Sequence, residues 1–283
     1  FSRASATLSR QNKATRKRIT IMDIYVCIKR VADTSEVDIE IDRTGLALTE
    51  DDFSYDINEW DNFAVEAALQ LKEEHGGKVT ALTVGIEDDE EVLRRALAMG
   101  CDEALHLSDP CFEGSDAWGI AQILSAALKG KPLDLLLFGT VSADEGAGQT
   151  GGFVAGLLDL PMVSLATSLK VNGSIATVSH EVEGGLERVR ELDLPAVVTV
   201  QTGINEPRYV SIRGIRKVSG IEIPVSGVGD LGLDPNQVGA SGARVKLEEL
   251  FLPPQGQSAQ MLEGSDDEII DKLLDLLQEN GGL

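Results

Sequence analysis

The stretch that decides the fold is LLLFGTVSADEGAGQTGGFVAGLL, residues 135–158. It begins with a continuous apolar run, which is typical of a strand buried on both faces of a parallel sheet. A loop with Gly146 and Gly148 follows, and a helix is expected to start at about Gln149. Glycines let backbone N–H groups approach an anion closely, and a helix N-terminus adds positive potential. The stretch therefore predicts a phosphate-binding loop or, alternatively, a plain strand-to-helix turn.

The acids of this loop also allow two interpretations. Asp144 and Glu145 stand beside the glycines, where they could accept hydrogen bonds from ribose hydroxyls or be solvated loop acids. The loop is not a P-loop, because no GK[ST] follows its glycines. It is also not the GxGxxG motif that follows the first strand in dinucleotide-binding folds.

Strand and helix signals alternate on the N-terminal side of this stretch. Apolar, β-branched runs predict strands, and amphipathic segments that end at glycine predict helices. The order β-α-β-α-β-α-β implies parallel strands joined by right-handed crossovers, in an α/β, Rossmann-like, mostly parallel sheet. Ligands in such sheets bind at the carboxyl ends of the strands. The predicted strands are 23–31, 78–85, 103–107 and 133–139, and the predicted helices are 58–75, 88–100 and 115–130.

The pattern changes after residue 160. Short strands at 163–171, 174–184, 186–192 and 196–200 predict a β-hairpin region, with a turn at Asn172-Gly173. The chain then becomes irregular and ends in one amphipathic helix, 265–280. Its apolar face must be buried, either on a partner subunit or on its own domain. The expected organisation is a basic leader or non-native extension (1–21), a nucleotide-binding α/β domain (22–205) and a C-terminal arm (206–283).

Charge separates the leader from the body of the chain. The formal net charge is −22, although residues 1–21 carry six basic side chains and no acid. The acidic body would repel phosphate, which excludes nucleic acid as a partner. The leader has the composition of an organellar transit peptide, or it lies outside the native domain. No apolar run approaches the roughly 18 residues of a membrane span.

The sequence contains no recognisable catalytic or metal-binding motif. Its three cysteines include no CxxC pair, and its three histidines are far apart. We therefore expect no disulfide framework and no metal site, in a reduced, intracellular protein. No GxSxG is present, and no cysteine has a nearby histidine. These absences favour a binder or carrier over an enzyme.

The segment VEGGLERVRELDLPAVVTV (182–200) closely resembles the signature segment of electron transfer flavoprotein beta subunits. Other matching segments follow in the family's order and spacing, from Met22 to the C-terminus. They are VCIKRVAD, DRTG, AVEAALQLKEEHGGKVTALTVG, RRALAMGCDEALHL, the loop ending GQTG, and NEPRY.

This resemblance implies a fold of the adenine nucleotide alpha hydrolase type and a role in electron transport. Such a subunit pairs with an alpha subunit, and the heterodimer holds one FAD at the alpha–beta junction and a structural AMP in beta. The dimer carries electrons from flavoprotein dehydrogenases, such as the acyl-CoA dehydrogenases of fatty acid oxidation, to a quinone oxidoreductase. In a bifurcating branch, a second FAD replaces AMP and reacts with NADH. The resemblance places the protein in the cytoplasm or, alternatively, in the mitochondrial matrix, without insertion into the membrane.

The resemblance also assigns site residues. Trp60 falls where the family often has an aromatic beside the shared flavin. Glu181 matches a glutamate needed for productive electron transfer with partner dehydrogenases, and Ile212 occupies the apolar position of the partner-recognition loop. The positions for AMP, or a second FAD, are Cys27, Asn58, Glu59, Trp60, Asp61, Val84, Gly139, Asp144, Glu145, Gly146, Ala147, Gly148, Gln149 and Thr150.

Three departures from the family pattern leave the nucleotide and the dehydrogenase open. Asn58 is followed by Glu59, where many members have Asn-Pro. The loop reads DEGAGQTG, with small residues where AMP-type members often carry further acids and an Asn before the Gln. The recognition loop has only Arg213, Arg216 and Lys217 in place of a lysine cluster.

Overall fold

The computed structural model describes residues 21–35, 37–50, 52–254, 256, 259 and 261–282. The predicted basic leader therefore lies, apart from Ile21, outside the described residues. The described chain forms two compact units. The first contains the described residues up to Ile39 and those from Glu50 to Leu247, and the second contains Glu40–Thr49 and the described residues from Glu248 onward.

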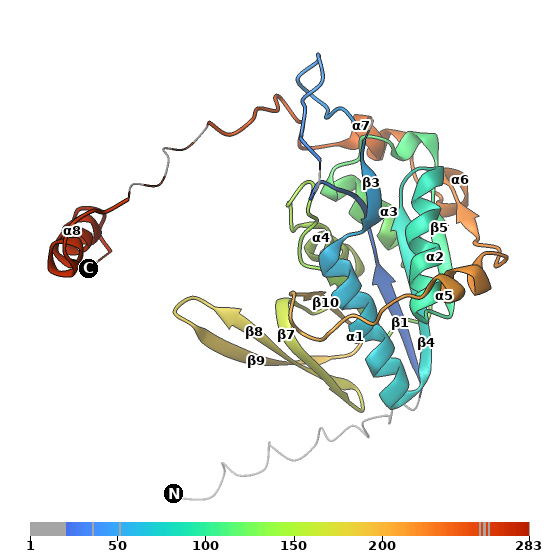
Figure 1. Ribbon diagram of the computed structural model, residues 1–283. Helices are drawn as coiled ribbons and strands as arrows, with labels where there is room; N and C mark the ends of the chain where they lie inside the picture. Colours follow the sequence, from blue (N-terminus) through green and yellow to red (C-terminus); the bar gives the residue numbers. More distant parts are fainter. Residues whose placement is uncertain are drawn as a thin grey trace, which may run out of the picture. The chain divides into compact units, whose positions relative to one another are not determined.

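The first unit is built on a large, mostly parallel sheet (Figure 1). In the described part of the chain the sheet has nine strands, in the order β11-β5-β4-β1-β6-β10-β7-β8-β9. Neighbours from β11 to β7 are parallel, whereas β8 and β9 continue the sheet antiparallel. The predicted Rossmann-like sheet with a hairpin region is thus confirmed. The strands are β1 (Met22–Cys27), β4 (Gly77–Val84), β5 (Glu103–Leu107), β6 (Leu135–Gly139), β7 (Met162–Asn172), β8 (Ile175–Val182), β9 (Leu186–Asp193), β10 (Ala196–Val200) and β11 (Val225–Ser226).

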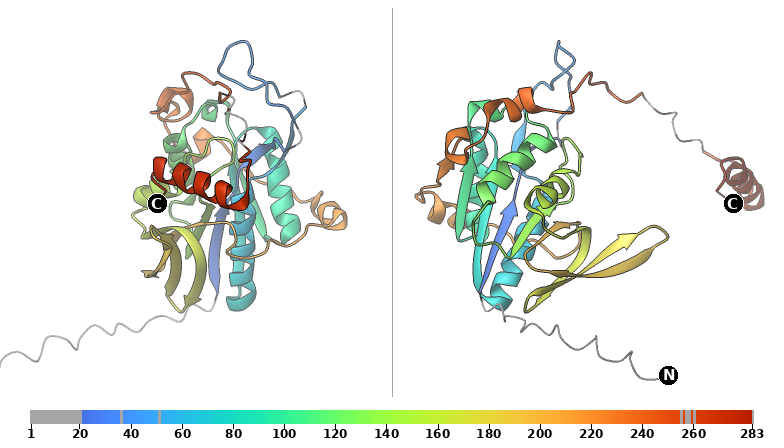
Figure 2. Two further views of the ribbon diagram at one scale, coloured as in Figure 1. Left: turned by 60° about the vertical axis from the view of Figure 1, so that its left-hand side comes forward. Right: turned by 180° about the vertical axis from the view of Figure 1, so that it is seen from behind.

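Helices cover both faces of this sheet, and a hydrophobic core lies under each layer (Figures 1 and 2). The helices α1 (Glu59–His75) and α2 (Glu90–Met99) bury apolar side chains against one face. The helices α3 (Ala117–Leu128) and α4 (Thr150–Leu158) cover the other. Because Leu135, Leu136 and Leu137 in β6 are fully buried, the continuous apolar run is explained by burial on both faces.

The first predicted strand, 23–31, is divided in the structure. β1 ends at Cys27, and the chain then forms β2 (Arg30–Asp33), which pairs antiparallel with β3 (Ser54–Ile57) in a separate small sheet. The break occurs because the backbone N–H of Lys29 donates to the side chain of Asp61 instead of extending the ladder. The strand β3 was not expected from the sequence.

The chain after residue 205 is more ordered than the sequence suggested. It forms α5 (Ile212–Val218), β11, α6 (Val228–Leu231) and α7 (Gly239–Gly242). The Arg208 guanidinium binds the buried Glu66 carboxylate of α1, with Nε to Oε2 at 2.7 Å, and donates to Glu73 at 2.8 Å. Residues 206–247 belong to the first compact unit. The predicted end of the nucleotide-binding domain at residue 205 stays a prediction.

The second unit carries the C-terminal helix α8 (Asp266–Glu279). At the start of this helix, the Glu268 carboxylate accepts a hydrogen bond from the Ser265 backbone N–H at 2.8 Å. Within the same unit, Leu250 donates its N–H to the Gly45 carbonyl at 2.8 Å. No helix in the described part of the chain is long and apolar enough to cross a membrane.

Candidate functional site

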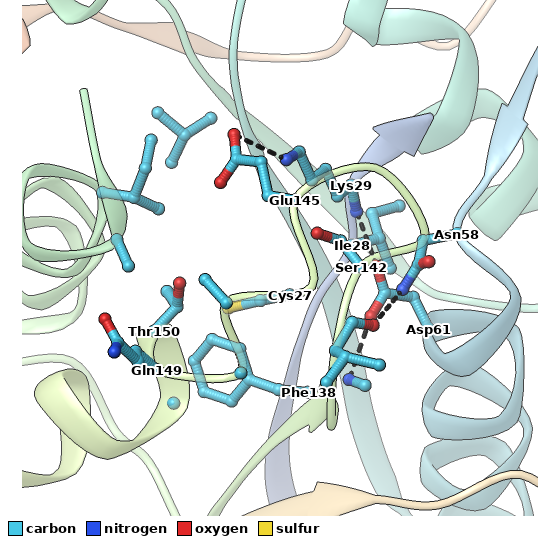
Figure 3. A pocket seen from close by; sticks show the side chains of 18 of the residues that line it. Cys27, Ile28, Lys29, Asn58, Asp61, Phe138, Ser142, Glu145, Gln149 and Thr150 are labelled. Atoms are coloured by element: carbon cyan, nitrogen blue, oxygen red, sulfur yellow. Dashed lines mark hydrogen bonds and ion pairs between the residues drawn. The ribbon is translucent and has the colours of Figure 1, made fainter. Parts of the chain in front are cut away.

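A cavity opens at the carboxyl ends of β1, β4 and β6 (Figure 3). β1 is the strand at which the chain order reverses, since β4 and β5 lie on one side of it and β6 on the other. Open α/β sheets bind ligands at such a switch point. The space between its walls, counted with the open solvent at the mouth, is about 840 Å³.

Asp61 ties two of these strand ends together from below the cavity. It lies in the first turn of α1 and is buried. Its carboxylate oxygens accept the backbone N–H of Lys29 at 2.8 Å and of Gly139 at 2.9 Å. Burial raises the pKa of Asp61 to about 7, although these N–H donors pull the pKa the other way. Asp61 therefore shapes the cavity wall through the backbone.

Gly139 allows this close approach. A Cβ atom at this position would lie 2.7 Å from the Cβ of Trp60 and would also collide with the Asp61 carboxylate. Only glycine therefore lets the end of β6 meet the first turn of α1.

Asn58 holds the loop between β6 and α4 in place. Its amide nitrogen donates to the Val141 carbonyl at 2.8 Å, and its amide oxygen accepts the Ala143 N–H at 3.1 Å. Asn58 is the N-cap residue of α1, but its side chain makes no capping hydrogen bond to that helix. The amide of a buried Asn is thus used to fix the loop that forms one cavity wall.

The end of this loop can present backbone N–H groups to an anion. Gly146 and Gly148 have φ of 61° and 60°, which brings the chain back to the start of α4. The N-cap residue of α4, Gln149, makes no capping hydrogen bond with its side chain, and Thr150 and Gly151 line the cavity. A Cβ at Gly148 would lie 3.3 Å from Val141. The first turn of α4 thus combines a tight glycine bend with N–H groups and positive helix potential, as a phosphate requires.

The inner part of the cavity is apolar. Leu82, Leu124 and Phe138 are buried and belong to its lining. Cys27 also lines it, and burial raises the pKa of its thiol well above the ordinary value. A neutral thiol is a weak nucleophile, so Cys27 contributes packing surface rather than covalent chemistry.

Three charged side chains meet at the mouth. The Lys29 ammonium lies 2.8 Å from an Asp144 carboxylate oxygen and 3.2 Å from one of Glu145. Figure 3 shows Lys29 and Glu145 facing each other beside the cavity. Among the described residues that line the cavity, Lys29 alone carries a positive charge. Sequence reasoning missed it, because the 23–31 segment was expected to be one continuous strand.

Ten of the fourteen positions expected to bind nucleotide line this cavity, and four do not. Those that line it are Cys27, Asn58, Asp61, Val84, Gly139, Glu145, Ala147, Gly148, Gln149 and Thr150. Glu59, Trp60, Asp144 and Gly146 are outside the lining. Lining residues that the sequence did not single out include Lys29, Ser115, Ser142 and Phe138.

Trp60 is held away from the cavity by a different contact. Its indole N–H donates to the Gln201 side-chain oxygen at 2.9 Å, beyond the end of β10. The ring is therefore fixed near the carboxyl ends of β6 and β10. The contact of Trp60 with the shared flavin stays a prediction.

The hairpin β8–β9 carries the second predicted region, and Glu181 is exposed near its turn. Glu181 pairs in register with Glu187 of β9. Like charges directly opposite in an antiparallel pair are destabilising. The hairpin therefore concentrates negative charge without a local benefit to stability.

Ile212 begins the short helix α5 and is 69% exposed. α5 packs on α2, and the Arg94 guanidinium donates to the Val218 and Ser219 carbonyls at 3.2 and 3.1 Å. The Ser211 hydroxyl caps the helix by accepting the Gly214 N–H at 3.1 Å. An apolar side chain is thus displayed from an anchored helix.

Known proteins resemble this chain over most of its length. The family model described as electron transfer flavoprotein domain matches residues 45–226. A Bacillus subtilis protein named electron transfer flavoprotein subunit beta is 38% identical, over 91% of this chain and 98% of its own. The human protein of the same name is 34% identical, over 86% and 94%. An Acetobacterium woodii protein named caffeyl-CoA reductase-Etf complex subunit CarD is 36% identical, over 91% and 98%.

Proposed function

The chain belongs to the electron transfer flavoprotein beta-subunit family. We propose that it catalyses no bond-making or bond-breaking reaction of its own. It pairs with an alpha subunit and holds AMP in the β1–β4–β6 cavity. The heterodimer carries FAD at the junction of the subunits and receives electrons from flavoprotein dehydrogenases for delivery to a quinone oxidoreductase or a similar acceptor. The protein acts in the cytoplasm.

The single observation that carries the nucleotide assignment is the combination of an apolar inner cavity with the glycine bend at α4. An adenine ring suits the surfaces of Leu82, Leu124 and Phe138. A phosphate suits the N–H groups of Thr150 and Gly151 at the helix start. The chain's own residues would thus bind and orient the nucleotide and exclude water from it.

Three surface features support the partner contacts. Glu181 lies opposite Glu187, whose carboxylate accepts the Thr167 hydroxyl at 3.0 Å, and this pair of acids offers a site for a cation on a partner protein. The exposed Ile212 offers an apolar anchor for a pocket on a dehydrogenase. Within the second unit, α8 leaves apolar side chains such as Ile270, Leu273 and Leu274 exposed, which supports packing on the alpha subunit.

A second candidate is a bifurcating protein, with a second FAD in place of AMP and electrons taken from NADH. The small residues of the loop favour it, because Ala147 and Gly148 line the cavity and leave room for a ligand larger than AMP.

The two candidates differ in cofactor content. The test is to purify the chain together with its alpha subunit and to measure flavin and AMP per heterodimer. One flavin and one AMP support the carrier, whereas two flavins without AMP support the bifurcating protein. A heterodimer without flavin would refute both.

A further inference from the structure

The charged side chains of Lys29, Asp144 and Glu145 form a cluster of ion pairs beside the cavity. Asp61 and Asn58 position the strand ends and the loop through backbone contacts. The cluster lies instead at the solvent side, with side-chain exposures of 39% for Lys29, 38% for Asp144 and 59% for Glu145. Because Lys29 and Glu145 line the cavity and Asp144 is paired with Lys29, a ligand that extends past this side of the cavity meets these charges.

The cluster is charged at neutral pH. Burial lowers the pKa of Lys29, but the hydrogen bond and charge of Asp144 and the charge of Glu145 outweigh it, and the net pKa is raised. Burial likewise raises the pKa of Asp144, but the Lys29 hydrogen bond reverses the effect, and the net pKa is lowered. One positive and two negative charges therefore face each other, which leaves a net charge of one negative unit.

We infer that this cluster makes the cavity selective for a nucleoside monophosphate over ligands that carry a second phosphate. The inference rests on the proposed adenine-nucleotide site. A single phosphate can bind at the start of α4 and leave the ion pairs of Lys29 intact. A second phosphate extending to the mouth meets the net negative charge, or it must draw Lys29 away from both carboxylates.

The second route leaves Asp144 and Glu145 facing the phosphate without their cation. Each then repels the ligand, and neither has another positive side chain among the described residues of the lining. The geometry of the loop preserves this arrangement, because Asn58 fixes the preceding residues Val141 and Ala143. This repulsion disfavours ADP and FAD, because both contain a diphosphate.

The test compares AMP, ADP and FAD binding to the nucleotide-depleted full chain by isothermal titration. The key variant is the double substitution Asp144→Asn/Glu145→Gln, which keeps similar shapes and changes the mouth from net negative to net positive. Glu103→Gln is the matched control, since Glu103 forms a comparable exposed pair with Lys78 at 3.0 Å away from the cavity. Thermal unfolding verifies that each variant is folded.

Wild-type protein is expected to bind AMP at least tenfold more tightly than ADP or FAD. The double variant is expected to reduce this preference at least tenfold, mainly through tighter ADP binding, while Glu103→Gln leaves it unchanged. High salt should weaken the wild-type preference, because the mouth is open to solvent. Lys29→Met, which leaves the acids without their cation, should keep or increase the preference for AMP.

If the wild type and the double variant prefer AMP over ADP and FAD to the same degree, the charged cluster does not cause the selectivity, although the nucleotide site remains supported. A collapse of the preference in Lys29→Met would show that Lys29 holds phosphate directly, and would also overturn it. If no adenine nucleotide binds the wild type, the proposed site itself fails.

Discussion

Replacing Asp61 with alanine should loosen the cavity and the fold together. In the structure, Asp61 is the acceptor for the backbone N–H groups of Lys29 and Gly139. Each buried N–H left without an acceptor costs about 1–3 kcal/mol, so two such groups could cost ~2–6 kcal/mol. Part of this cost is offset because the variant no longer buries a carboxylate, whose raised pKa reflects the penalty of burial. We expect a net loss of about 3 kcal/mol in the free energy of unfolding.

A matched control lies at the other end of the same two strands. Asp134, directly before β6, accepts the Asp23 N–H of β1 at 2.9 Å. Asp134→Ala removes one such bond far from the cavity and should cost about 1 kcal/mol. Urea unfolding gives both free energies, and AMP titration gives the effect on the site.

AMP affinity should fall for Asp61→Ala, because Lys29 and Gly139 line the cavity, and should stay unchanged for Asp134→Ala. The role of Asp61 in holding the cavity is refuted if Asp61→Ala costs no more stability than Asp134→Ala. It is also refuted if Asp61→Ala leaves AMP affinity at the wild-type value.

Two further substitutions test contacts outside the cavity. Arg208→Ala should cost about 2 kcal/mol, because the buried Glu66 carboxylate loses hydrogen bonds from the partly exposed Arg208 guanidinium. Burial raises the pKa of Glu66, but the Arg208 hydrogen bonds more than reverse this, and the net pKa is lowered. The stability contributed by the pair is therefore present above the unfolded pKa of 4.5 and lost as pH falls through the lower folded pKa, so wild type and variant should converge in acid denaturation. Glu181→Ala should leave flavin content and dimerisation intact but slow electron transfer from a dehydrogenase, measured by stopped-flow. The control Glu191→Ala, on the same hairpin, should have no effect on this rate. Loss of folding in Glu181→Ala would mean that Glu181 has a structural role.

Much of the sheet could be predicted because its signals are local. The apolar run at 135–139 and the glycine turn at Asn172-Gly173 each identify an element by themselves. Parallel order then places the strand ends at one edge, where the cavity is found. The hairpin β8–β9 was predicted from the same kind of pattern, in spite of its charges.

The missed features depend on contacts between distant residues. Asp61 ends β1 by capturing the N–H of Lys29, 32 residues earlier in the chain. That contact turns Lys29 out of the predicted strand and into the cavity lining. Asn58 and Asp61 line the cavity, and their predicted ligand contacts stay predictions. Their hydrogen bonds to the backbone of the cavity walls were not expected from the sequence. Composition and spacing carry no signal for such long-range hydrogen bonds.

Acceptance of electrons from a flavoprotein dehydrogenase defines the carrier that we propose. The most direct measurement mixes the heterodimer anaerobically with a substrate-reduced acyl-CoA dehydrogenase, or with NADH, and follows the flavin absorbance by stopped-flow. We expect rapid flavin reduction by the dehydrogenase and none by NADH. Rapid bleaching by NADH, or no reduction by any flavoprotein dehydrogenase tested, would contradict it.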